Sequence, residues 1–281
     1  MRVVTRLADW RAATERARAD GKVVGLVPTM GALHEGHATL MRTARSECDF
    51  VVATIFVNPR QFNDAGDLAA YPSTPAADER ICEEAGVDLL VRPELGEMWP
   101  SYPEPTATTV SVRGVGDNYE GAGRPGHFDG VASVVTKLFA LNGPGRAYFG
   151  EKDFQQVAVV RTLAADLGFD VDVVAVPLVR DQDGLALSSR NVRLSASGRG
   201  RALAMSRLLR VVHEGRWTLA EVAEVVAREL EGLEVLYADV IDPATVRAAG
   251  PDFHGEARLL LCVVVDGVRL IDNGPVMMRR S

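Results

Sequence analysis

The sequence predicts an α/β protein: a Rossmann-like parallel sheet flanked by helices, with a smaller C-terminal α+β domain. Two observations support this fold class. Continuous apolar and β-branched segments alternate with segments of helical periodicity, which is typical of a parallel sheet covered on both faces. After about residue 180 the pattern changes to a Ser- and Arg-rich segment, two helical stretches and further strand-like stretches. We therefore expect one domain over residues 1–178 and a smaller one over residues 179–281.

Each element follows from its local pattern. The strands are short apolar runs without alternation, as expected of strands buried on both faces. The helices carry apolar residues on one face, and one of them has Thr74 at a position suited to an N-cap, followed by Pro75. In chain order we expect helices at 7–20, 34–47, 74–87, 130–142, 153–168, 196–213 and 218–231, and strands at 22–28, 49–59, 87–93, 145–150, 170–179, 233–242 and 257–273.

Composition restricts the function classes. The net charge of −7 over 281 residues argues against a chain-wide binder of nucleic acid or of an anionic membrane, although a local basic pocket for phosphates remains compatible with it. Cys48, Cys82 and Cys262 are scattered, without a CxxC pair, which suits a reducing compartment better than a disulfide scaffold. No apolar run approaches the roughly 20 residues of a membrane helix. We expect a cytoplasmic protein.

The unusual residues follow the ends of the predicted strands. Ligands of parallel α/β sheets bind beyond the carboxyl ends of the strands. Four segments of this chain combine such a position with polar or glycine-rich sequence: Pro28–His37, Asn58–Phe62, Gly150–Gln156 and Val179–Asn191. Their convergence predicts a ligand site at this edge of the sheet.

The stretch VPTMGALHEGH places His34 and His37 at the start of a predicted helix. Three interpretations are open. The HExH spacing is one residue short of the zinc-binding HExxH motif, and no third ligand is apparent. The histidines could instead be structural, or they could bind phosphate, because a helix N-terminus offers free N–H groups and a partial positive charge. Gly31 and Gly36 would allow a nucleotide to approach the main chain closely.

Other polar groups could complete a phosphate site, although each alone has an ordinary structural explanation. Lys152 and Asp153 at a strand-to-helix turn could hold a phosphate and a ribose hydroxyl or Mg²⁺, or could be a solvated surface pair. The segment LSSRN could clamp phosphates or be a Ser-rich linker. Neutral Asn58 and Gln61 suit a hydroxylated substrate, as does one of Gln155 and Gln156. Arg124 and His127 lie in a glycine-rich loop and could meet a carboxylate.

Five blocks taken together resemble the pantoate–β-alanine ligase family: PTMGALHEGH, FVNPRQF, GHFDGVASVVTKLF, YFGEKDFQQ and DGLALSSRN, which span residues 28–191. HEGH also resembles the HIGH motif of nucleotidyltransferases, and LSSRN resembles their KMSKS-type loop. The resemblance implies an ATP-dependent ligation in which pantoate is first adenylated, releasing pyrophosphate. The β-alanine amine then displaces AMP to form pantothenate. It implies a nucleotide- and pantoate-binding first domain and a lid-like second domain.

The resemblance also implies residue roles. His34, His37 and Lys152 would be catalytic, with His37 the family's usual proton donor. Gln61, Gln156 and Asn58 would bind pantoate, and Gln61 also β-alanine, while Tyr71, Arg124 and His127 are secondary candidates. ATP would be bound by Met30, Gly31, Ala32, Leu33, His34, Glu35, Gly36, His37, Gly150, Glu151, Lys152, Asp153, Val179, Leu187, Ser188, Ser189 and Arg190.

Two departures from the family pattern stand out. Leu187 occupies a position where methionine is common, and the exchange conserves volume. The segment AADER follows Thr74-Pro75 at a place where relatives often carry more acidic residues. We therefore expect Mg²⁺ to be held by the ATP phosphates rather than by protein carboxylates. Asp78 is the aspartate that remains in this segment. The family resemblance also implies a homodimer. Competing hypotheses are a nucleotidyltransferase with a phosphorylated acceptor, and a nucleotide-binding regulator without catalysis.

Overall fold

The computed structural model describes residues 1–280. The chain forms two compact units, the first from Met1–Glu151 and Gln155–Pro177, the second from Lys152–Phe154 and Leu178–Ser281. The segment Lys152–Phe154 therefore belongs with the C-terminal unit, although its neighbours in sequence belong to the first. The sequence offered no sign of this excursion.

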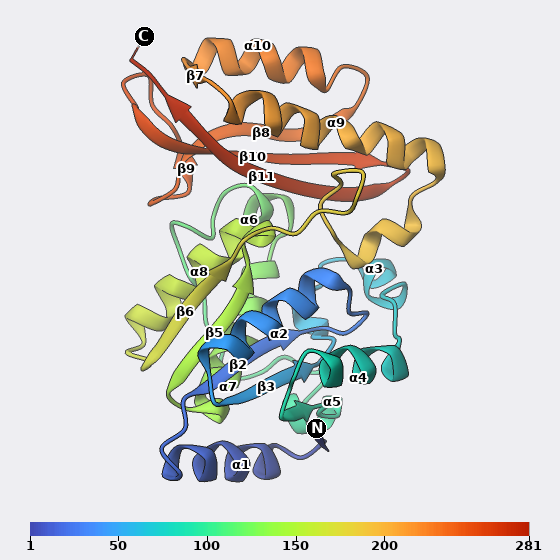
Figure 1. Ribbon diagram of the computed structural model, residues 1–281, viewed down its shortest axis with the longest axis vertical. Coiled ribbons are helices and arrows are strands. Elements are labelled where there is room, and N and C mark those ends of the chain that lie inside the picture. The colour runs from blue at the N-terminus through green and yellow to red at the C-terminus, as the bar shows by residue number, and fades with distance from the viewer. Residues whose placement is uncertain (281) are drawn as a thin grey trace. The chain divides into compact units, whose positions relative to one another are not determined.

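The first unit contains a six-stranded sheet in the order β1-β4-β3-β2-β5-β6 (Figure 1). Every strand pair in it is parallel, so the predicted α/β class is confirmed. All five expected strands are present. Four of them are shorter than predicted, and β5 has the predicted bounds. The edge strand β1 was not expected. The strands are β1 (Arg2–Val4), β2 (Val24–Thr29), β3 (Phe50–Ile55), β4 (Leu89–Val91), β5 (Gly145–Gly150) and β6 (Val171–Val176).

Helices cover both faces of this sheet, which explains why its strands are apolar throughout. Leu26 and Val27 are neighbours in β2 but belong to different buried clusters, because successive side chains point to opposite faces. One face carries α1 (Leu7–Ala19), α7 (His127–Asn142) and α8 (Phe154–Asp166), and the other α2 (Glu35–Glu47) and α4 (Pro75–Glu84). Short helices that were not expected are α3 (Ala65–Ala69), α5 (Leu95–Met98), α6 (Glu120–Gly123), η1 (Pro59–Gln61) and η2 (Glu151–Asp153).

The strand order reverses between β2 and β5. From β2 the chain proceeds to β3 and β4 on one side, and β5 and β6 lie on the other. The two central strands pair at Gly25–Arg146 and Leu26–Ala147, near their amino ends. Such a reversal opens a crevice at the carboxyl ends of the strands, where open α/β sheets bind ligands. The loop Met30–His34 follows β2, and Gly150 ends β5, so both lie at this crevice.

The second unit is a five-stranded sheet in the order β7-β11-β10-β8-β9, packed against two helices. Asp266 and Gly267, at φ angles of 52° and 73°, form the tight turn of the β10–β11 hairpin. Within residues 1–280, no helix is both long and apolar enough to cross a bilayer. The elements are η3 (Ser189–Arg193), α9 (Ala196–His213), β7 (Arg216–Trp217), α10 (Leu219–Glu229), β8 (Glu234–Asp242), β9 (Arg247–Ala248), β10 (Gly255–Val265) and β11 (Val268–Met278).

Candidate active site

The loop after β2 is held by a buried carboxylate. Asp78, on α4, is only 2% exposed and accepts the main-chain N–H groups of Ala32 at 3.0 Å and Leu33 at 2.8 Å. Ala32 has a φ of 50°, a conformation that costs a non-glycine residue energy and persists only where the surroundings impose it. Thr74 occupies the N-cap position of α4, as expected, but its hydroxyl donates to the same carboxylate at 2.9 Å and makes no capping bond to the helix main chain. Asp78 is thus an anchor of the loop, and its oxygens are engaged by protein donors.

The two histidines are fixed by main-chain donors at the start of α2. The Gly36 N–H donates to His34 Nδ1, and the His34 N–H donates to His37 Nδ1, each at 3.2 Å. Their ring centroids lie 4.1 Å apart. A ring nitrogen that accepts a hydrogen bond carries no proton, so both rings hold their proton on Nε2. Each histidine therefore has its ring N–H at Nε2.

This arrangement corrects one expectation. We expected free main-chain N–H groups at the start of α2, but the Gly36 N–H is bound to His34 Nδ1, and the His37 N–H donates to the His34 carbonyl at 2.8 Å. These two N–H groups are therefore engaged within the protein. Nothing supports the zinc interpretation, since residues 1–280 contain no cluster of three or more His, Cys, Asp or Glu side chains arranged for a metal.

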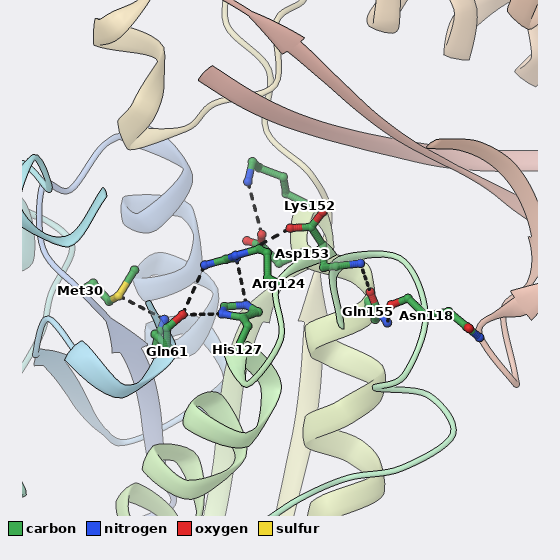
Figure 2. Close-up of polar contacts among 9 residues, drawn as sticks. Met30, Gln61, Asn118, Arg124, His127, Lys152, Asp153 and Gln155 are labelled. Atoms are coloured by element: carbon green, nitrogen blue, oxygen red, sulfur yellow. Dashed lines mark hydrogen bonds and ion pairs between the residues drawn. The ribbon is translucent and has the colours of Figure 1, made fainter. Parts of the chain in front are cut away.

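A second group of polar residues surrounds Gln61, at the end of η1. The Gln61 side chain is held between two partners. Asn58 Nδ2 donates to its Oε1 at 3.0 Å. On the other side, Figure 2 shows its Nε2 against the Met30 sulfur, at 3.2 Å. Asn58 is 1% exposed, and its amide also bonds to the Gly130 carbonyl at 3.1 Å and to the Trp99 indole N–H at 3.0 Å. Asn58 therefore supports Gln61, and the structure brings Gln61 against Met30 of the β2 loop.

The Gln61 main chain is held from the other side by the loop before α7. His127 Nδ1 lies 2.8 Å from the Gln61 carbonyl oxygen, and Arg124 Nη1 lies 3.1 Å from His127 Nε2 (Figure 2). A carbonyl only accepts and a guanidinium only donates, so this ring carries its proton on Nδ1. Glu120 forms an ion pair with Arg124 at 3.7 Å. Arg124 and His127, expected as possible carboxylate binders, thus position Gln61.

The two adjacent glutamines of α8 have different roles. Gln155 is 5% exposed, and its Nε2 donates to the carbonyls of Val115 and Asn118 at 2.9 and 2.7 Å, while its Oε1 accepts the Glu120 N–H at 3.0 Å (Figure 2). Its amide is fully used in holding the loop that carries Glu120. Gln156 is half-buried. The structure therefore favours Gln156 over Gln155 for a substrate.

The remaining predicted ATP-binding groups belong mainly to the second unit. Lys152 Nζ lies 3.4 Å from an Asp153 carboxylate oxygen. The Leu187 N–H donates to the Val179 carbonyl at 3.0 Å, and the Ser188 hydroxyl accepts the Arg190 N–H at 3.3 Å, beginning η3. The segment Val179–Leu187 is therefore a closed hairpin, and the hydroxyls and the guanidinium of Ser188–Arg190 follow directly after its closing bond, at the start of η3. Other predicted positions are Gly150 at the end of β5, Glu151 in η2, and Tyr71, whose ring packs edge-on against Phe62.

Comparison with known proteins identifies the family of the chain. The family model for pantoate-beta-alanine ligase matches residues 2–275. The chain belongs to the pantoate–β-alanine ligase family. The pantothenate synthetase of Paracoccus denitrificans is 48% identical to it over 283 residues, which cover 99% of each chain.

Solved structures show the same fold. The crystal structure of pantothenate synthetase from Thermus thermophilus matches with a TM-score of 0.88 and 45% identity, covering 98% of this chain and 99% of that one. The ligase from Francisella tularensis, solved with beta-gamma ATP and β-alanine, matches with a TM-score of 0.81 and 30% identity, covering 98% and 97%. The present chain is accordingly an ATP-dependent ligase of pantothenate synthesis, and the family reaction passes through an acyl adenylate.

The sequence analysis did not find the supporting roles of Asp78, Trp99, Glu120 and Gln155. One signal was available, because Glu120 stands four residues before Arg124, a spacing at which opposite charges pair on a helix. The others act on residues far away in sequence and left no local pattern.

Proposed function

We propose that this ligase activates pantoate with His34 and His37 as hydrogen-bond donors to the phosphates of ATP. A pantoate carboxylate oxygen attacks the α-phosphorus, the bond to the bridging oxygen breaks, and pyrophosphate leaves. The β-alanine amine then attacks the acyl carbon, loses a proton, and AMP departs. The observation that carries the proposal is the pair of main-chain bonds to Nδ1, which place the ring proton of each histidine on Nε2. Fixed donors stabilise charge developing in a phosphoryl-transfer transition state.

The pantoate and β-alanine roles fall to neutral amides. We assign Gln61 and Gln156 to pantoate, Gln61 also to β-alanine, and Asn58 to the support of Gln61. A neutral amide donates to hydroxyl and carboxylate oxygens without forming an ion pair that would hold the nucleophilic carboxylate back from the phosphorus. Arg124 and His127 keep Gln61 in place through its carbonyl.

The phosphates and the nucleoside have separate binding groups in this proposal. Lys152, Ser188, Ser189 and Arg190 supply cations and hydroxyls for the phosphates. The adenine is assigned to the main chain near Val179 and Leu187. The ribose is assigned to Gly150, Glu151 and Asp153, and the β2 loop from Met30 onward borders the triphosphate. The C-terminal domain, residues 179–281, would act as a lid that carries the Ser188–Arg190 loop.

Mg²⁺, the assembly and the compartment are further parts of the proposal. The donors around the β2 loop do not form a metal cage, because the Asp78 carboxylate is engaged by N–H and hydroxyl donors. Mg²⁺ would then be held by the phosphates of ATP and by water, its usual mode with nucleotides, and would neutralise phosphate charge. The family suggests a homodimer, and the three scattered cysteines suit the cytoplasm.

The test separates the reaction into its two steps. Exchange of labelled pyrophosphate into ATP, with Mg²⁺ and pantoate, reports adenylate formation alone, and AMP release on adding β-alanine reports the second step. We expect exchange to require pantoate. If exchange proceeds equally without pantoate, or with a phosphorylated acceptor in its place, the ligase assignment is wrong. Protein that binds ATP without any exchange would support the regulator hypothesis.

Two variants test the assigned groups. Lys152→Ala should reduce exchange by at least about 100-fold, as expected for the loss of a charge on a transferring phosphoryl group, while the unfolding transition is unchanged. Near-normal exchange would remove Lys152 from the site. His37→Phe keeps an aromatic ring of similar size but lacks Nε2–H, and it should also reduce exchange strongly.

A further inference from the structure

Two adjacent residues of β11, Asp272 and Asn273, are polar and buried in the sheet of the second unit, with exposures of 2% and 6%. Burying polar side chains is unfavourable unless they are hydrogen-bonded, so their partners indicate their purpose. Alternation along the strand sends them to opposite faces. Asp272 lies on the face of Gly274, which packs against Leu209 of α9, and Asn273 lies on the other.

Asn273 holds the segment that contains Lys152. Its Nδ2 donates to the Lys152 carbonyl at 2.9 Å, and its Oδ1 accepts from Arg258 Nη1 at 2.5 Å. The Arg258 guanidinium in turn lies over the Phe154 ring, 4.4 Å from its centroid. Lys152–Phe154 is thus fixed at its first carbonyl and at its last side chain. These contacts explain why this segment belongs with the second unit.

Asp272 holds the root of the Ser188–Arg190 loop. Its two carboxylate oxygens accept from the two terminal nitrogens of Arg180 at 2.7 and 3.0 Å, a bidentate pair in which the Asp272 side chain is fully buried. Arg180 also donates to the Gly184 carbonyl at 3.1 Å and pairs with Ala186 in a β-bridge. Arg180 therefore closes the hairpin that leads to Ser188, through its contacts with Gly184 and Ala186.

We propose that Asp272 and Asn273 are positioning residues, which hold Lys152 and the Ser188–Arg190 loop in a fixed relation by anchoring both to one strand. Two segments that are far apart in sequence thereby share the motion of a single rigid element. Neither anchor touches substrate; each acts through the residue it holds. Fixing charged groups before the nucleotide arrives lowers the ordering required in the transition state. The inference rests on the proposed phosphate-binding role of Lys152.

The first experiment asks whether Asn273 affects the kinetic constants for ATP and not those for pantoate. Asn273→Ala removes the amide, and Asn273→Asp keeps its size and an acceptor for Arg258 but cannot donate to the Lys152 carbonyl. We expect both to lower kcat/KM for ATP in pyrophosphate exchange at least tenfold, with the KM for pantoate within twofold of wild type. Val263→Ala is the matched control: Val263 is buried in the same sheet, in the cluster facing the helices, and should lower the Tm without changing KM for ATP.

The second experiment asks whether Asn273 acts through Lys152. Kd for ATP is measured by calorimetry for Asn273→Ala, Lys152→Ala and the double variant. A positioning role predicts about a tenfold weakening by Asn273→Ala in the wild type and less than a twofold further weakening in the Lys152→Ala background. A merely structural role predicts the same factor in both backgrounds and overturns the inference. Phe154→Leu, which removes the aromatic partner of Arg258, provides the same comparison if Asn273→Ala does not fold.

The outcomes also separate this inference from the proposed function. Unchanged ATP binding by Lys152→Ala would refute the phosphate role of Lys152, and this inference with it. Normal ATP binding by Asn273→Ala and Phe154→Leu beside a defective Lys152→Ala would refute this inference alone. Asp272→Asn, which keeps the shape but not the charge, should weaken ATP binding while leaving pantoate unaffected; no change would exclude Asp272 from the pair.

Discussion

The anchoring of the β2 loop by Asp78 makes a sharp prediction for Asp78→Ala. The substitution removes the acceptor of the Ala32 and Leu33 N–H groups and leaves two main-chain donors without their partner. It also releases Ala32 from the left-handed conformation that the carboxylate imposes. The loop should then populate other conformations, and the fraction of molecules ready to bind ATP should fall.

The magnitude follows from the bonds that are lost. A hydrogen bond to a charged group contributes about 1.5–3 kcal/mol, so two of them contribute about 3–6 kcal/mol. Relief of the left-handed conformation returns roughly 1–2 kcal/mol. With the middle of each range, the native loop loses about 3 kcal/mol relative to its alternatives. Since 1.4 kcal/mol corresponds to a factor of ten, the apparent Kd for ATP should rise by up to about 100-fold.

The assay is ATP binding by calorimetry together with a thermal melt. We expect Asp78→Ala to raise the Kd for ATP at least tenfold. Thr74→Val is the matched control, because it removes only the hydroxyl bond to the same carboxylate and conserves the shape of the side chain. Both main-chain N–H groups keep their acceptor in this variant, so its Kd should stay within threefold of the wild type.

Two results would refute the reasoning. If Asp78→Ala is folded and its Kd for ATP lies within threefold of the wild-type value, the carboxylate does not set the binding conformation of the loop. If Thr74→Val weakens ATP binding as much as Asp78→Ala does, general destabilisation of α4 explains the effect, and the two N–H bonds are not the cause.

Three further predictions concern other parts of the first unit. His127→Phe removes the hydrogen bond to the Gln61 carbonyl and should raise the KM for pantoate about tenfold, as expected from the loss of roughly 1.4 kcal/mol, while the KM for ATP is unchanged in steady-state kinetics. Burial raises the pKa of the Cys82 thiol from its usual 9.0 to about 12, so the contribution of Cys82 to the free energy of unfolding should be constant below pH 9 and be lost above it. The free energy of unfolding measured in urea should therefore fall less steeply above pH 9 for Cys82→Ala than for the wild type. Gly130→Ala should lower the Tm, because an added Cβ would lie 2.1 Å from the Arg60 carbonyl oxygen; an unchanged calorimetric Tm would contradict this.

The fold was predictable where elements are long and their patterns repeat. Continuous apolar runs identified the central strands, because both faces of the sheet are covered. The three-residue β1 was missed because it is too short to show a pattern. The start of α7 was placed at Gly130 instead of His127, since glycine is usual at boundaries; here it lies inside the helix, where the Arg60 carbonyl approaches closely.

The site was predictable in its residue types and not in its supports. Strand ends and motif spacing indicated His34, Gln61 and Lys152 directly. Several supporting residues lie 35 to 121 positions from the groups they hold, as the contacts of Gln155 with Glu120, Asp78 with Leu33, and Asn273 with Lys152 show. Contacts over such separations are created by the tertiary fold and leave no periodic signal in the sequence.

The histidines show how such a contact changes the chemistry that a motif implies. A protonated imidazolium could not accept the main-chain N–H groups that meet both Nδ1 atoms, so the bonds seen here select the neutral ring with its proton on Nε2. Full transfer of that proton would leave an imidazolate, a far stronger base than a departing pyrophosphate oxygen. The geometry therefore favours His37 as a hydrogen-bond donor to the developing charge over the proton-donor role that the family resemblance implies.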